Sequence, residues 1–190
     1  MPVDFLSILD ETNSTKDDKT GEIILTAPTF STTEDYEITK PCRITSNCGT
    51  IIKSQHFEIK SNSVSFTNIN FRTSVHVVNS DNFQIMSCTS KEAKLLDGAF
   101  CFFNCKNVYL NDVTITETNN ITGIYITQDC TVTAENLNIY GLSETLLVCN
   151  TLSCLYLKNS QLHHTKANAI FISGGSYIEI RKCSLFDTVY

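Results

Sequence analysis

Apolar residues recur along most of this chain in short alternating stretches that repeat at a nearly constant interval. Six stretches align without gaps on the pattern apolar–x–apolar–x–x–apolar or small–x–apolar. They occupy residues 64–71, 83–90, 108–115, 132–139, 155–162 and 178–185, and their starts lie 19, 25, 24, 23 and 23 residues apart. A period of this length is the sequence signature of a solenoid, in which each repeat packs on its neighbours.

A further alternating stretch precedes each of the last five repeats at a fixed distance. The positions eight and six residues upstream are apolar or Cys in every case, namely Val75/Val77, Phe100/Phe102, Ile124/Ile126, Leu147/Cys149 and Ile170/Ile172. Inside the repeats, polar corners such as Thr67-Asn68 and Lys158-Asn159 separate two stretches. Because strand side chains alternate between two faces, each corner shifts the phase of the inward positions.

Three short strands and three turns in about 23 residues predict one coil of a parallel β-helix. The chain is therefore expected to be all-β, with about six to seven coils stacked about 4.8 Å apart. A β-sandwich is the alternative. Its hairpins favour Asn-Gly or Asp-Gly turns, and Asp97-Gly98 is the single such dipeptide.

The residues that open the repeat region follow a recognisable order. Residues 22–30 predict a strand and a turn, and Ile38, Lys40, Pro41 and Ile44 then form an Ile-x-Lys-Pro-x-x-Ile segment. This arrangement resembles the opening coil of the right-handed parallel β-helix (pectin-lyase-like) superfamily, with Pro28 where that family usually has Gly. The resemblance covers about residues 22–190 and implies a single-stranded, right-handed coil. It is specific for fold and not for function, because this fold hosts many functions.

The two ends of a β-helix expose strand edges that need covering. Apolar residues of the N-terminal segment are spaced for a short amphipathic capping helix over the first coil, namely Val3, Phe5, Leu6, Ile8 and Leu9. Residues 1–21 are thus expected to form a cap and a polar connector, and residues 22–190 the β-helix domain. The sixth repeat runs almost to Tyr190. We therefore expect the domain to be a piece of a larger protein, or to be covered by another chain at that edge.

Composition narrows the class of protein further. The net charge is −6, which argues against nucleic-acid binding, because that function needs clustered Lys and Arg. No apolar run approaches the roughly 18–20 residues that span a bilayer. Nine Cys cannot all pair within one chain, and the N-terminus lacks the features of a secretory signal. These features predict reduced thiols and a cytoplasmic protein.

Catalytic chemistry is not evident in the sequence. The resemblance would imply the Asp-rich motifs of polygalacturonases or the calcium-binding Asp set of pectate lyases, and no such motif occurs. His163 and His164 are the best remaining chemical candidates, but neighbours on a strand point to opposite faces, so a shared metal is poorly served. Cys101 is expected to face outward and to be the most reactive thiol, whereas Cys105, Cys130 and Cys154 lie near corners where thiols can stack. We predict no enzyme activity, no cofactor and no metal.

One outward row of the first strands is unusually apolar for a solvated sheet face, and a second row lies beside it. The candidate partner-binding residues on these rows are His76, Val78, Cys101, Phe103, Tyr125, Val148 and Phe171. Exposed apolar patches usually mark partner sites, with aromatic anchors. The alternative is that a loop such as residues 91–98, or the N-terminal segment, covers these rows.

The outward rows of the first and second strands favour two functions from different classes. The first is a noncatalytic scaffold or protein-interaction domain that binds a protein partner, or a second copy, through the apolar first-strand face. The second is a carbohydrate-binding or polysaccharide-active domain, which would use the outward second-strand residues Tyr109, Tyr156 and Glu179. A stiff rod in a fibre is a third role that this fold permits.

Overall fold

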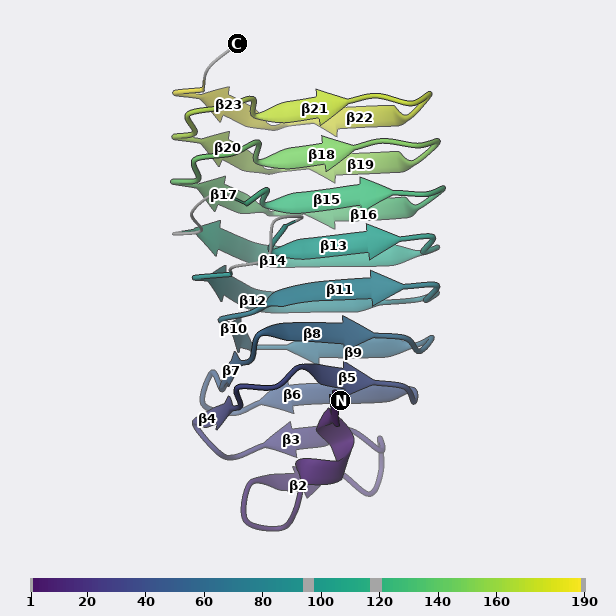
Figure 1. Cartoon of the computed structure of the whole chain (residues 1–190), viewed down its shortest axis with the longest axis vertical. Helices are drawn as coiled ribbons and strands as arrows, with labels where there is room; N and C mark the ends of the chain where they lie inside the picture. The colour runs from purple at the N-terminus through teal and green to yellow at the C-terminus, as the bar shows by residue number, and fades with distance from the viewer. Residues whose placement is uncertain (1, 94–97, 117–120, 189–190) are drawn as a thin grey trace.

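A computed structural model describes residues 2–93, 98–116 and 121–188, and it is a parallel β-solenoid of about seven turns. The predicted all-β parallel β-helix is thus confirmed, and the β-sandwich alternative is wrong. In Figure 1 the near strands run to the right and the far strands to the left as the chain rises, so the coil is right-handed.

The first strand of each coil belongs to an eight-stranded sheet in which all neighbours are parallel. Its strands, in spatial order, are β1 (Val3–Asp4), β5 (Tyr36–Ile38), β8 (His56–Ile59), β11 (Ser74–Val78), β13 (Phe100–Phe103), β15 (Ile124–Thr127), β18 (Leu147–Cys149) and β21 (Ile170–Ile172).

The second and third strands of each coil form one larger sheet that bends around a corner. The second strands are β3 (Ile23–Leu25), β6 (Cys42–Ser46), β9 (Val64–Thr67), β12 (Gln84–Lys91), β14 (Val108–Thr116), β16 (Thr131–Glu135), β19 (Cys154–Lys158) and β22 (Tyr177–Arg181). The third strands are β4 (Thr29–Ser31), β7 (Ile51–Lys53), β10 (Asn70–Phe71), the last residues of β12 and β14, β17 (Asn138–Tyr140), β20 (Gln161–His163) and β23 (Ser184–Phe186).

The corner between second and third strands is made by single residues with left-handed backbone. Their φ angles lie between 49° and 57°, at Asn68, Ser87, Asp112, Asn136 and Asn159. Asn and Asp tolerate this conformation better than other residues with a side chain. One such residue turns the strand without ending it, so β12 and β14 run through the corner as continuous strands.

The core is a set of columns that run along the solenoid. Val108 pairs with Val132, and Val132 pairs with Leu155, in parallel register. Leu110, Ile126 and Leu137 are also buried, as the alternation predicts. The inward phase assigned from the sequence is therefore confirmed for the repeats between β9 and β19.

The N-terminal cap is a single 3-10 turn, η1 (Phe5–Ile8), with the Asp4 carboxylate accepting from the Leu6 N–H at 3.1 Å. The Phe5 ring is fully buried, and its centroid lies 5.2–5.4 Å from those of Phe30, Tyr36 and Phe57. The segment expected to be a polar connector contains β2 (Ser14–Lys16), which pairs with β3 in antiparallel fashion. This hairpin reaches across the boundary placed at residue 21, and β2 lies beyond β3 at the N-terminal end of the solenoid (Figure 1).

Candidate functional site

The apolar row predicted on the first strands exists as one column of neighbours. Parallel register places His76 beside Cys101, Cys101 beside Tyr125, Tyr125 beside Val148 and Val148 beside Phe171. The second row begins with Val78 beside Phe103, two residues further along the same strands.

The exposure of this column differs from the expectation in its middle. Cys101 is fully buried and Val148 is 8% exposed, whereas Phe171 is 46% exposed. A Cβ placed on Gly98 would lie 3.1 Å from the Cys101 Sγ and 3.4 Å from the Tyr125 Cβ, so the backbone at Gly98 lies directly against this column. The expectation that Cys101 faces solvent is therefore wrong. Residues 94–97 of the loop weighed as a cover lie outside the described residues.

The partly exposed members of the two rows pack on one another. The His76 ring lies 4.3 Å from that of His56 and 5.6 Å from that of Phe103, and the Phe103 ring lies 6.1 Å from that of Tyr125. The Tyr125 hydroxyl accepts a hydrogen bond from Asn150 Nδ2 at 3.2 Å. These side chains therefore present a fixed surface, with Tyr125 held by its hydroxyl and its ring.

Two carboxylates extend the same column toward the N-terminus, and sequence reasoning missed them. Glu58 is the parallel neighbour of His76, and Glu37 is the neighbour of Glu58. Lys60 Nζ lies 2.6 Å from the Glu58 carboxylate and 4.0 Å from that of Glu37. The signal was hidden because the following turn is one residue shorter, so the buried Phe57 and Ile59 lie seven and five residues before Val64.

Large exposed apolar side chains gather on the last coil. They are Phe171, Ile172, Tyr177, Ile180, Leu185 and Phe186, each 42–51% exposed. Ile180 is the parallel neighbour of the fully buried Leu157, and Leu185 is the neighbour of the fully buried Leu162. The last coil therefore shows, at its open side, positions that face the core in the coil before it.

The row proposed for carbohydrate also exists. Tyr109, Tyr156 and Glu179 share one column through Thr133. Toward the N-terminus the same column continues through Gln84 and Ser65 to Arg43. Arg43, Ser65 and Gln84 line an open groove of about 570 Å³. Its other lining residues are Glu22, Ser63, Thr67, Asn82 and Met86. Glu179 is ion-paired with Arg181.

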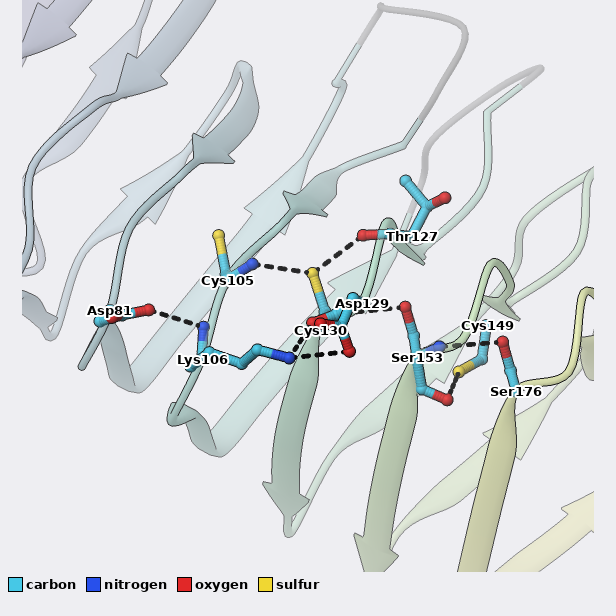
Figure 2. A network of polar contacts seen from close by, with 9 residues as sticks. All are labelled: Asp81, Cys105, Lys106, Thr127, Asp129, Cys130, Cys149, Ser153 and Ser176. Carbon is cyan, nitrogen blue, oxygen red and sulfur yellow. Dashed lines mark hydrogen bonds and ion pairs between the residues drawn. The ribbon is translucent and has the colours of Figure 1, made fainter.

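A ladder of small polar side chains occupies the corner between first and second strands (Figure 2). The Cys105 N–H donates to the Cys130 Sγ at 3.2 Å, the Cys130 N–H to the Ser153 Oγ at 3.1 Å, and the Ser153 N–H to the Ser176 Oγ at 3.1 Å. The predicted stacking of Cys105 and Cys130 agrees with this ladder. Cys154 does not belong to it, because it is the strand neighbour of Thr131.

The ladder makes the Cys105 thiol a weaker acid and also satisfies backbone donors in the corner. The hydrogen bond between the Cys105 and Cys130 side chains, followed by burial, raises the pKa of Cys105. The backbone N–H groups of Cys105, Cys130 and Ser153 each receive an acceptor from the next coil, which satisfies donors in this corner. Within the described residues, no group of three or more His, Cys, Asp and Glu side chains is arranged to hold a metal ion.

Among the described residues, no helix has the length and apolar character required to cross a membrane. Comparison of the chain with family models, with curated proteins and with solved structures finds no match.

Proposed function

We propose that this chain is a noncatalytic β-helix scaffold that binds a protein partner at the end of its first-strand face. The observation that carries the proposal is the exposure of Phe171, which ends a column whose middle is buried. Aromatic side chains that combine exposure with a fixed position are the usual anchors of protein interfaces. Tyr125, two strands away in the same column, is held by Asn150 and adds a second ring to this surface.

The partner is a protein whose side chains cover the Phe171 ring and the Tyr125 ring of the same column. Aromatic side chains carry much of the binding energy at protein interfaces, so loss of the Phe171 ring is expected to weaken binding.

Photo-crosslinking tests this proposal. A benzophenone amino acid at position 171 is expected to cross-link a protein, including a second copy of the chain. The matched control carries the same group at Tyr109, which lies in the second-strand row. Excess wild-type chain should suppress the cross-link at position 171, and excess Phe171→Asp should not. Equal cross-linking from both positions, or suppression by both competitors, would contradict the proposal.

A carbohydrate-binding or polysaccharide-active domain is the second candidate. It is favoured by the polar groove beside Arg43, Ser65 and Gln84, whose column leads to Tyr109 and Tyr156. Tyrosine rings offer a flat apolar face with a polar tip. A glycan array, with hydrolase and lyase assays on acidic polysaccharides, tests this candidate. Tyr156→Ala and Arg43→Ala should reduce any binding and Phe171→Asp should leave it unchanged; silence of the wild type on all substrates removes it.

We also propose that the chain is a divergent member of the pectin-lyase-like superfamily and is a cytoplasmic protein. The first point is supported by the three-strand coil and by the opening segment with Ile38, Lys40, Pro41 and Ile44. The second is supported by nine Cys, several of which fill the core. Protein purified from its source without reductant should then show nine reactive thiols in denaturant. A smaller number would contradict the cytoplasmic assignment.

A further inference from the structure

The adjacent residues His163 and His164 point toward each other. His163 ends β20 and shares an outward column with Tyr140 and Phe186. The backbone of His164 has a φ of 53°, in the left-handed region, which breaks the alternation of a strand. The two Nδ1 atoms consequently lie 2.5 Å apart, so the expectation that these side chains face opposite ways is wrong.

The other nitrogen of each ring contacts an oxygen acceptor. His164 Nε2 lies 3.3 Å from the Asp187 carboxylate, and His163 Nε2 lies 3.1 Å from Asn138 Oδ1. A carboxylate and an amide oxygen only accept hydrogen bonds, so a neutral His ring that donates to either of them carries its proton on Nε2. In the neutral rings both Nδ1 atoms then present lone pairs to each other. Two lone pairs at this distance repel unless a cation lies between them.

The packing around His163 holds its ring in this orientation. The ring stacks between those of Tyr140, at 5.1 Å and 1°, and Phe186, at 4.6 Å and 6°. The His164 and Asp187 side chains are 59% and 65% exposed, so an ion can reach the pair from solvent.

We propose that His163 Nδ1 and His164 Nδ1 bind a divalent transition-metal ion of the Zn²⁺ class, with Asn138 and Asp187 orienting the two rings. Imidazole nitrogen suits Zn²⁺, Cu²⁺ and Ni²⁺, and metal-ligating His side chains almost always donate their other N–H to a carboxylate or carbonyl oxygen. Tetrahedral Zn²⁺ with bonds of about 2.0–2.1 Å separates two ligands by about 3.3 Å, so the rings need to part by less than about 1 Å. Water, or a donor from a bound molecule, fills the remaining positions.

Nuclear magnetic resonance of the ring nitrogens tests this site on the full chain. In ¹⁵N-His-labelled protein, Zn²⁺ should shift the Nδ1 resonances of His163 and His164 and saturate at one equivalent. The resonances of His56 and His76 act as internal controls and should not move. This readout separates the imidazole site from zinc bound by thiols such as Cys48, which is exposed.

Variants identify the contribution of each residue. His163→Phe keeps a ring between Tyr140 and Phe186 but removes Nδ1, and it should abolish the Zn²⁺ shift of His164. Asp187→Asn should weaken Zn²⁺ binding by about 10–100-fold, the usual effect of losing an outer-shell partner. Asp81→Asn, a corner Asp remote from β20 in sequence, is the matched control and should bind as the wild type does.

Three results would overturn the proposal. The first is that His163 and His164 resonances do not respond to Zn²⁺. The second is that His163→Phe, with an unchanged melting temperature, leaves the Zn²⁺ shift of His164 intact. The third is a single proton shared between the two Nδ1 atoms that Zn²⁺ does not displace, in which case the cation between the rings is a proton.

Discussion

The two ends of the solenoid repeat the same coil but differ in what covers them. At the N-terminal end, η1 and β2 lie over the first coil, where β2 pairs with β3, and Phe5 is fully buried among three rings. At the other end, Ile180 is 43% exposed although Leu157, in the same column, is fully buried. The apolar residue is inward in both coils, so burial comes from the neighbouring coil. In a solenoid each repeat contacts chiefly its neighbours, and stability is shared through these interfaces.

The largest effect is expected from removing the cap. Phe5→Ala deletes a ring that contacts Phe30, Tyr36 and Phe57, and a buried Phe→Ala change costs about 3–5 kcal/mol. Denaturant unfolding measures the loss. Leu6→Ala, on the same turn but only partly buried, is the control and should cost less. Equal losses would show that the cap does not act through the Phe5 ring.

One column of the core contains a buried residue, Leu157, and its exposed counterpart in the last coil, Ile180. Leu157→Ala should cost about 2–5 kcal/mol in free energy of unfolding, because it leaves a cavity between two coils. Ile180→Ala, one coil later, should cost about 1 kcal/mol or less, since the side chain is already partly in water. Denaturant unfolding of both variants measures the difference. Similar costs would mean that Ile180 is covered in solution, for example by a second copy.

The corner ladder allows a smaller test of the same idea. Ser153→Ala removes the acceptor of the buried Cys130 N–H and should cost about 1–3 kcal/mol. Ser176 lies in the last coil and accepts the hydrogen bond of the Ser153 N–H. Water can take the place of its hydroxyl at this open side, so Ser176→Ala should cost about 0.5–1 kcal/mol. Hydrogen exchange at the two amides reports each loss directly. If hydrogen exchange became faster by the same factor at the Cys130 and Ser153 amides, the result would contradict the claim that burial by a neighbouring coil determines the cost.

The smallest effect on stability is expected in a thiol-labelling experiment, which tests whether the thiols of the middle coils are buried. Hydrogen bonds from Thr50 and Ser46 lower the pKa of the exposed Cys48. Burial raises the pKa of Cys88 to about 11 and that of Cys149 to about 11. Because the thiolate is the nucleophile, iodoacetamide should modify Cys48 first in the native protein near neutral pH.

Mass spectrometry over a time course identifies the modified residue, and Cys48→Ser should remove the fast phase. Modification of Cys101 before Cys48 would contradict the burial of Cys101 under Gly98.

Sequence periodicity predicted the columns of the core but not what covers the outside. Alternation places Val108, Val132 and Leu155 in register, because inward positions repeat with every coil. The same alternation makes Cys101 outward, and it carries no information on the backbone at Gly98 that buries it.

Local backbone conformation accounts for the other differences. The φ of His164 turns its ring back toward His163. His is enriched at positive φ, but such residues are only a few per cent of the total, so the residue type alone did not predict this turn. A turn one residue shorter before Val64 hid Glu37 and Glu58 from the alignment of repeats. Loop length and single left-handed residues decide which side chains meet at the surface, and neither is encoded in the apolar pattern.

The most direct test of the account is the pattern of nuclear Overhauser effects between methyl groups of the core column. Coils stacked in parallel register predict contacts from Val108 to Val132 and from Val132 to Leu155, and no contact from Val108 to Leu155. A contact that skips the middle coil, or the absence of both neighbour contacts, would contradict the solenoid and every surface assigned to it.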